Sequence, residues 1–379
     1  MKPVYFDNAA TTPLRKEVVE AMTKVLNETF GNASSTHGYG RSSKAILESC
    51  RKQIATLFNV SAAEIIFTSG GTEANNFILQ SAVESLGVEH IITSKVEHHA
   101  ILHTAEALAN SKKVEVSYVK LKEATIDFNH FEELLQSDKK TLVALMHINN
   151  EVGTILDIEK AAKLAKDFGA LFHSDTVQSV GHLNLDLQQI PADFIISSAH
   201  KFHGPKGVGF AFIRKNSGLK PIFFGGEQER GYRPGTEALH NIVGLTEALK
   251  LSYSNLADEK TYILSLKTYF IEELKKHISD IQFNGLSDDL SKSSYTILNV
   301  RLPKTKVQGD MIQFQLDLKG IACSRGSACQ SGSVQASHVL MELLSPEELQ
   351  KPSIRFSLSS FNTREEVDYV VTTLKDLIN

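Results

Sequence analysis

The stretch that decides the fold and the chemistry of this chain is Ser197-Ser198-Ala199-His200-Lys201-Phe202-His203-Gly204-Pro205-Lys206-Gly207-Val208-Gly209. The residues just before it, 192–197, read Ala-Asp-Phe-Ile-Ile-Ser, which predicts a short buried strand. Lys201 therefore follows a strand end, and ligands bind at that edge of an α/β sheet. A neutral lysine amine placed there can attack an aldehyde. The alternative is a solvated surface lysine; the hydroxyls before Lys201 and the Gly-Pro turn after it favour a ligand site.

Strands and helices alternate on both sides of this stretch. Strands are predicted at 64–68, 90–94, 113–118, 141–147, 171–174, 193–197 and 208–213. Helices are predicted at 15–27, 39–58, from about 72, and at 98–110, 129–136 and 157–168. Asp157 would cap the last helix and Gly169 would end it. This alternation predicts an α/β fold with a mostly parallel, mixed sheet covered on both faces.

The pattern changes after about residue 255. Two amphipathic helices, at 238–254 and 258–277, lead into shorter elements: strand 295–300, helix 307–317, strand 353–356 and helix 363–378. We therefore expect a large domain over 15–255 and a smaller α+β domain formed by 1–14 and 256–379.

Composition restricts the functional classes. The 379 residues carry a net charge of −4, so charge gives no argument for nucleic acid or an anionic membrane as a partner. No segment reaches the ~20 apolar residues of a membrane span. Residues 1–7 lack the apolar core of a signal peptide, and the three cysteines cannot form a disulfide framework. These features predict a cytoplasmic protein.

A glycine-rich turn, Thr68-Ser69-Gly70-Gly71-Thr72, joins a predicted strand to a predicted helix. Backbone N–H groups at such a helix start attract anions. The motif matches neither the Walker sequence nor the dinucleotide-binding spacing. Alone it is a weak signal, because many strand–helix turns contain glycine.

Polar side chains follow two more predicted strands. Asp175 ends the strand before Thr176-Val177-Gln178, where its carboxylate would either pair with a protonated ring nitrogen or cap a helix. Gln178 would reach an oxygen on the same ring. His98 opens the helix after strand 90–94, where an imidazole can stack on a flat cofactor and move protons. A metal site formed with His99 and His103 is the disfavoured alternative, because carboxylate or thiolate ligands are missing.

Two groups can bind a carboxylate. Asn150, in Asn149-Asn150-Glu151, follows strand 141–147 and offers an amide, although an Asn pair also forms turns. Arg355 lies on one face of the strand Ser353-Ile354-Arg355-Phe356-Ser357 and can make two parallel hydrogen bonds. An exposed edge arginine is the alternative.

The cysteines fall into different environments. Cys329 lies among small polar residues in a loop, about 323–334, which suits an exposed nucleophilic thiol. Cys323 follows an apolar pair and is expected at the end of a buried strand. Cys50 shares a helix face with Ile46, Ile54 and Leu57 and is expected in the core.

Together these motifs resemble the pyridoxal-phosphate-dependent cysteine desulfurases, within the class V aminotransferase fold. The resemblance runs from Phe6-Asp7-Asn8-Ala9-Ala10 to the last helix. Its most specific parts are Ser198-x-His200-Lys201 with its glycines, Arg233-x-Gly235-Thr236 and Ser327-Ala328-Cys329. The loop length resembles the long-loop branch used in iron–sulfur cluster assembly. The resemblance implies fold type I, with the catalytic cysteine loop in the small domain.

The resemblance also implies a role for each residue. Lys201 would bind the aldehyde of pyridoxal 5'-phosphate and later move the α-proton, and Cys329 would take sulfur as a persulfide. Asp175 would pair with the ring nitrogen, Gln178 with the phenolic oxygen, and His98 would stack on the ring. The phosphate would be held by Gly71, Thr72, Ser198 and His200, and by Thr236 from a neighbouring subunit, which implies a homodimer. Asn150 would contact cofactor and substrate, and Arg355 would bind the substrate carboxylate.

The implied reaction converts L-cysteine to L-alanine and passes sulfur to acceptor proteins, with a cluster scaffold among the candidates. No resident metal is implied, although Cys329 could transiently ligate an iron–sulfur cluster. Cluster assembly, tRNA thiolation and thiamine synthesis all remain open as destinations. Two alternatives are another pyridoxal-phosphate enzyme, such as an aminotransferase or selenocysteine lyase, and a non-catalytic sulfur carrier or assembly scaffold.

Overall fold

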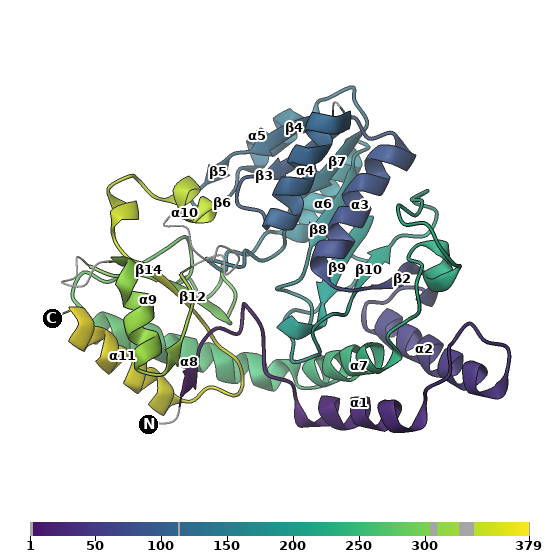
Figure 1. Cartoon of the computed structure of the whole chain (residues 1–379). Coiled ribbons are helices and arrows are strands. Elements are labelled where there is room, and N and C mark those ends of the chain that lie inside the picture. The colour runs from purple at the N-terminus through teal and green to yellow at the C-terminus, as the bar shows by residue number, and fades with distance from the viewer. Residues whose placement is uncertain (1–2, 113, 304–308, 326–336, 379) are drawn as a thin grey trace.

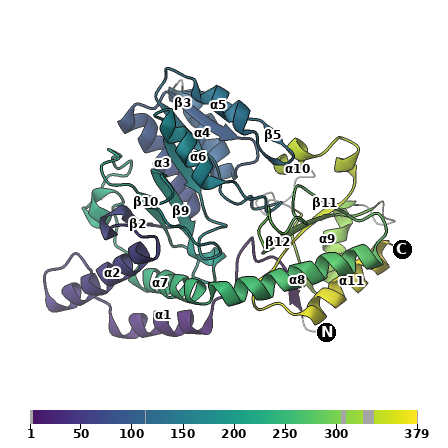
Figure 2. The ribbon, with the colours of Figure 1, turned by 180° about the vertical axis from the view of Figure 1, so that it is seen from behind.

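The computed structural model describes residues 3–112, 114–303, 309–325 and 337–378. A large sheet with helices on both faces forms one part of the molecule, and a smaller group of strands and helices, near both ends of the chain, forms the other (Figure 1). The long helix α8 (Leu256–His277) runs beneath the smaller part and continues the line of α7 (Leu239–Ser254) (Figure 2).

The large sheet has seven strands. Their spatial order is β2 (Ile65–Thr68), β10 (Gly209–Ile213), β9 (Phe194–Ser198), β8 (Leu171–Asp175), β7 (Thr141–Ala144), β3 (His90–Ser94) and β4 (Glu115–Val119). The pairs from β9 across to β4 are parallel, whereas β10 is antiparallel to both neighbours. The prediction of a mostly parallel, mixed sheet is therefore confirmed. Because β2 and β9 are each antiparallel to β10, the carboxyl ends of β2, β9, β8, β7 and β3 lie at one edge.

Helices bury both faces of this sheet. The helices of the large part are α1 (Lys16–Glu28), α2 (Gly38–Leu57), α3 (Gly71–Leu86), α4 (His99–Lys112), α5 (Phe128–Leu135), α6 (Ile158–Asp167) and α7. On one face, Phe77 and Ile78 of α3 and Ile101 of α4 join one core with strand residues such as Ile196. On the other, α2, α5, α6 and α7 join a second core that includes Cys50, as predicted.

Local signals explain several helix ends. Asp157 Oδ1 accepts a hydrogen bond from Lys160 N at 3.0 Å, so it caps α6 as predicted. Gly169 follows this helix with φ +72°, a left-handed conformation that glycine adopts at little cost, which confirms the predicted helix end. A short hairpin, β5 (Leu121–Lys122) and β6 (Thr125–Ile126), precedes α5.

The smaller part has its own core. Its elements are β11 (Gln282–Phe283), β12 (Ile297–Arg301), β14 (Ser353–Ser357), α8, α9 (Gly309–Leu318), α10 (His338–Leu343) and α11 (Arg364–Ile378). The strands form an antiparallel sheet in the order β11-β12-β14. Leu298 and Phe356 of this sheet pack with Phe270 of α8 and Val370 of α11.

The N-terminal segment joins this smaller part. β1 (Val4–Tyr5) pairs in parallel with β13 (Ile321–Ala322), and Val4 and Phe6 belong to the smaller core. Cys323 directly follows β13 and is 7% exposed, as expected from its place after an apolar pair. The division at residues 14/15 and 255/256 stays a prediction, with the helix break at Asn255, between α7 and α8, lying close to it.

Four one-turn helices complete the description: η1 (Ala62–Glu64), η2 (Ala199–Lys201), η3 (Gln228–Gly231) and η4 (Glu348–Gln350). Within the described residues, none of the helices has the length and apolar character needed to cross a membrane.

Candidate functional site

A cavity of about 280 Å³ lies at the carboxyl edge of the large sheet, and we call it the strand-end cavity. It brings together ten of the residues predicted from sequence: Gly71, Thr72, His98, Asn150, Asp175, Gln178, Ser198, His200, Lys201 and Arg355. These residues come from six segments that are distant in sequence. The parallel strands meet at this edge, which explains their convergence.

Lys201 ends η2, directly after the buried strand β9. Its Nζ atom donates hydrogen bonds to the carbonyl oxygens of Ala9, at 2.6 Å, and Ala10, at 2.8 Å. His182 Nε2 lies 3.1 Å from the backbone oxygen of Lys201. The amine is thus held in the cavity by the N-terminal segment and not extended into solvent.

Asp175 ends β8 and is 7% exposed. Its Oδ2 accepts a hydrogen bond from Asn75 Nδ2 at 2.8 Å, and its Oδ1 accepts one from Val177 N at 3.0 Å. His173 Nε2 lies 2.8 Å from Asn75 Oδ1 and orients this amide in turn. The carboxylate therefore stabilises the local turn and also lines the cavity, while its pairing with a ring nitrogen stays a prediction.

The start of α3 has the geometry of an anion site. Gly70 adopts φ +147°, and a Cβ at Gly71 would lie 2.9 Å from Val177 Cγ2, so the backbone packs too tightly here for a side chain. His200 lines the same cavity, and burial lowers its pKa to about 4. Its buried Nδ1 has no hydrogen-bond partner among the described residues. A neutral imidazole and helix N–H groups can both donate to an anion.

His98 also lines the cavity, immediately before α4. Its Nδ1 accepts a hydrogen bond from Ala100 N at 3.1 Å, which leaves Nε2 to carry the proton of the neutral ring. Burial lowers the pKa of His98, although the nearby Asp175 opposes that shift. The imidazole is therefore neutral at pH 7.

The neighbouring histidines do not form a metal centre. The rings of His99 and His103 stack within α4 with their centroids 4.7 Å apart. The ring centroid of His338, in α10, lies 4.4 Å from that of His99. Across the chain as the structure describes it, no group of three or more His, Cys, Asp or Glu residues could hold a metal ion.

Arg355 forms the third charged group of the cavity. It is only 2% exposed. Its Nη1 donates to Asn150 O at 2.7 Å and its Nη2 donates to Asp7 Oδ1 at 2.9 Å. Its Nε is buried and finds no hydrogen-bond partner in the described ranges. The alternative of an exposed edge arginine is therefore wrong, and the guanidinium lines the cavity in an orientation that two partners fix.

The two roles considered for the asparagine pair, turn formation and ligand binding, fall on different residues. Asn149 Oδ1 accepts hydrogen bonds from Glu151 N at 2.9 Å and Val152 N at 3.0 Å, so Asn149 forms the turn. Asn150 lines the cavity. Gln178 also lines it, and its Nε2 donates to Ala9 O at 3.0 Å.

The two remaining predicted site residues are Cys329 and Thr236. Cys329 falls outside the described residues. Thr236 is exposed and does not line the strand-end cavity.

Sequence reasoning missed four contributors to the site. Asn75 and His173 orient Asp175, Asp7 pairs with Arg355, and the Ala9 carbonyl holds both Lys201 and Gln178. Asn75 lies one helical turn after Gly71, on the side that faces β8, and this spacing was the available signal. Nothing local in the sequence pairs Asp7 with a residue 348 positions away.

Comparisons with known proteins agree with this geometry. Residues 4–370 match the family model described as aminotransferase class-V. Cysteine desulfurase IscS of Dictyoglomus turgidum is 41% identical over 380 residues, which cover all of this chain and 95% of the relative. A solved NifS-like protein superposes with a TM-score of 0.89 at 34% identity, covering 99% of this chain and 98% of the other. The structure of SspA in complex with cysteine gives a TM-score of 0.80 at 29% identity, over 95% of this chain and all of the other.

Proposed function

The chain belongs to the class-V aminotransferase family and, within it, to the cysteine desulfurases, and on this premise we propose that it transfers sulfur from L-cysteine to Cys329 with the help of pyridoxal 5'-phosphate. The observation that carries the proposal is that an amine, a carboxylate and a guanidinium, those of Lys201, Asp175 and Arg355, line one cavity with a helix N-terminus.

The residues of the strand-end cavity fit this cofactor. The buried Nδ1 of His200, which has no partner among the described residues, and the tight backbone at Gly71 suit the phosphate, and Thr72 and Ser198 line the same cavity. Asp175 would hold the ring nitrogen, Gln178 the phenolic oxygen and Lys201 the aldehyde carbon. His98 would lie against the ring. When bound, the cofactor supplies an electron sink for the bonds at the substrate's α-carbon.

The chain's own groups do the remaining work. Arg355 and Asn150, which both line the cavity, would orient the substrate by its carboxylate. The Lys201 amine, released from the Ala9 and Ala10 carbonyls, would move the α-proton. Neutral His98 would carry a second proton at Nε2.

The atoms and electrons of the sulfur transfer balance without an external oxidant. The Cys329 thiolate would attack the substrate sulfur and form an S–S bond, while the substrate C–S bond breaks and its electron pair stays on carbon. Protonation of that carbon gives L-alanine, and the enzyme keeps the sulfur as a persulfide. The persulfide would then pass to an acceptor protein.

We extend the proposal to assembly and location. Thr236 is exposed and does not line the cavity of its own chain, which supports a homodimer in which it reaches the neighbouring cavity. The sulfur acceptor would be a protein, and a cluster scaffold is one candidate. The enzyme would act in the cytoplasm. Neither nucleic acid nor membrane is proposed as a direct partner.

One experiment tests the function against its nearest alternative. Purified protein loaded with pyridoxal phosphate is incubated with L-cysteine, and alanine and protein-bound persulfide are quantified together. Equal initial amounts of both products are expected in a single turnover. Formation of 3-mercaptopyruvate in place of alanine would instead assign an aminotransferase.

A further inference from the structure

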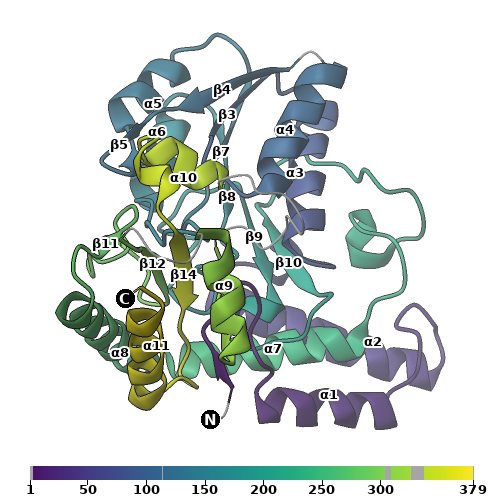
Figure 3. The same ribbon diagram turned by 60° about the vertical axis from the view of Figure 1, so that its left-hand side comes forward.

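The turn that carries Asn150 touches both parts of the molecule. It comprises residues 149–154, closed by hydrogen bonds from Gly153 N to Asn149 O at 2.9 Å and from Asn149 N to Thr154 O at 3.0 Å, and we call it the Asn150 turn. The strands β12 and β14 of the smaller part lie side by side beneath the large sheet (Figure 3). Contacts from these strands therefore decide where the Asn150 turn lies.

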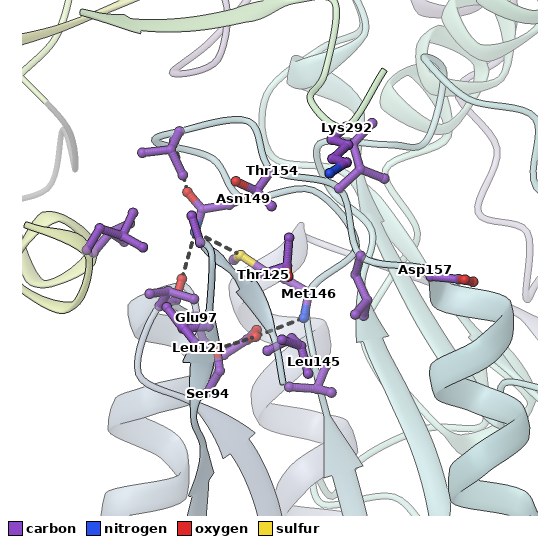
Figure 4. Close-up of a pocket in the computed structure, with 18 of the residues that line it drawn as sticks. Ser94, Glu97, Leu121, Thr125, Leu145, Met146, Asn149, Thr154, Asp157 and Lys292 are labelled. Atoms are coloured by element: carbon purple, nitrogen blue, oxygen red, sulfur yellow. Dashed lines mark hydrogen bonds between the residues drawn. The ribbon is translucent and has the colours of Figure 1, made fainter. Parts of the chain in front are cut away.

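Each end of the Asn150 turn is held separately. At its start, Asn149 Nδ2 donates a hydrogen bond to Val96 O of the large part at 2.9 Å (Figure 4). Near its end, Gly153 O accepts one from Ser294 N of the smaller part at 2.8 Å. The peptide groups between these points carry the side chain of Asn150 into the strand-end cavity, so their orientation matters most for a ligand.

Two side chains of the smaller part bind the middle of this turn. Asn299 of β12 lies directly opposite Arg355 of β14 in the antiparallel register. Arg355 Nη1 donates to Asn150 O at 2.7 Å, and Asn299 Nδ2 donates to Glu151 O at 2.9 Å. Side chains directly opposite each other share one face of a sheet, about 5 Å apart. A cross-strand pair thus binds two consecutive carbonyl oxygens of the Asn150 turn.

The Asn299 amide is buried and fixed in one orientation. The residue is 0% exposed. Its Oδ1 accepts a hydrogen bond from Asn284 Nδ2 at 2.8 Å, and the same Asn284 nitrogen donates to Ser353 Oγ at 2.9 Å. Because a carbonyl oxygen can only accept, the amide nitrogen of Asn299 must face Glu151 O. A variant without this donor would leave a carbonyl and an amide without their partners in a buried region.

We propose that Asn299 is a positioning residue for the substrate carboxylate. Arg355 is already shared between Asp7 and Asn150 O, so a carboxylate that binds Arg355 competes with its contact to the turn. The Asn299 bond to the next carbonyl holds the turn in place during this competition. Asn299 does not line the strand-end cavity and acts through Asn150 and Arg355. The inference rests on the proposed function, which assigns the carboxylate to those two residues.

The test compares two amines by titrating the visible spectrum of the full-length holoenzyme. L-alanine carries a carboxylate, and ethylamine is the same molecule without it, so the ratio of their affinities reports on the carboxylate site. Asn299→Ala should weaken the binding of L-alanine about fivefold, as the loss of one net hydrogen bond predicts, and leave that of ethylamine unchanged. Asn299→Asp, which replaces the donor by an acceptor, should have at least the same effect.

Ser287→Ala is the matched control. Ser287 is also 0% exposed, and its Oγ donates to the backbone oxygen of Asn299 at 2.9 Å. The variant therefore loses a buried hydrogen bond at the same residue but keeps the side-chain amide, and both affinities should stay unchanged. Circular dichroism verifies folding. If neither Asn299 variant folds, Asn284→Ala takes their place, because it removes the donor that orients the Asn299 amide; it should lower the affinity ratio about twofold.

An unchanged affinity ratio in a folded Asn299 variant, or in Asn284→Ala where it replaces them, would overturn the proposal. Equal weakening of both amines would overturn it as well, because general damage to the cavity does not distinguish the carboxylate. If the unmodified holoenzyme binds L-alanine no better than ethylamine, the carboxylate site of the proposed function is itself contradicted. The two proposals therefore fail in distinguishable ways.

Discussion

Asp7 Oδ1 accepts a hydrogen bond from Arg355 Nη2 at 2.9 Å, and this pair fastens the N-terminal segment to β14 at the strand-end cavity. The contact joins residues from opposite ends of the chain. It fixes the plane of the guanidinium, whose Nη1 is directed to Asn150 O at 2.7 Å. A substrate carboxylate would thus meet a cation that is already oriented.

Arg355→Lys should raise the KM for cysteine by about tenfold or more, because an ammonium cannot reproduce the planar set of donors that Arg355 divides among Asp7, Asn150 and a ligand. Steady-state kinetics measure the change. The matched control is Arg364→Lys, an exposed position on α11. If the KM is the same in both variants, a role for Arg355 in substrate binding is contradicted.

Asn75→Ala should lower kcat by about tenfold, because Asp175 loses the hydrogen bond at 2.8 Å that orients its carboxylate. The visible spectrum of the bound cofactor should shift as well, which a purely structural defect would not produce. Asn76→Ala, one position along α3, serves as the control, because the Asn76 amide bonds Thr72 O and Gln80 Nε2 of the same helix. An unaltered spectrum in Asn75→Ala would contradict the role assigned to this residue.

Cys329→Ser should abolish persulfide formation while the cofactor remains bound. Cys323→Ala is the control, because burial raises the pKa of the Cys323 thiol to about 12 and keeps it unreactive. Mass spectrometry after one turnover should find the extra sulfur on the peptide containing Cys329. Extra sulfur on Cys323, or full activity of Cys329→Ser, would refute the proposed nucleophile.

Acid should destabilise the protein through buried histidines such as His147, which is 4% exposed. Burial lowers the pKa of His147 from 6.5 to about 4. Between these values the unfolded chain binds the proton first, so the stability present above pH 6.5 is lost as the pH falls toward 4. The full effect is about 3 kcal/mol for this residue.

Urea unfolding at a series of pH values measures this effect at a fixed protein concentration. His147→Gln should flatten the dependence between pH 6.5 and 4, whereas His277→Gln, at an exposed position of α8, should not. If the free energy of unfolding changes with pH equally in the unmodified protein and in His147→Gln, the role of His147 in acid destabilisation is contradicted.

The sequence predicted most of the fold because the central strands are continuous apolar runs. Residues 90–94 and 353–356 correspond to β3 and β14 within one residue, and other elements differ by a few residues at their ends. The antiparallel direction of β10 could not be predicted, because a fully buried strand has the same pattern in either direction. The pairing of β1 with β13 could not be predicted from the sequence either, since it depends on packing between distant segments.

The candidate site was predictable where strands end. Lys201 and Asp175 follow apolar runs, so their place at the sheet edge follows from the pattern of the strands. Asn75 and Asp7 could not be assigned in this way, because their roles depend on which elements pack side by side.

The central claim is that Lys201 binds the aldehyde of pyridoxal phosphate, and borohydride reduction tests it most directly. The holoenzyme is reduced and digested, and its peptides are analysed by mass spectrometry. The account predicts that the peptide containing Lys201 gains the mass of the reduced cofactor and that Lys201→Ala gains none. An unmodified Lys201 peptide from a fully reduced, cofactor-loaded protein would contradict it.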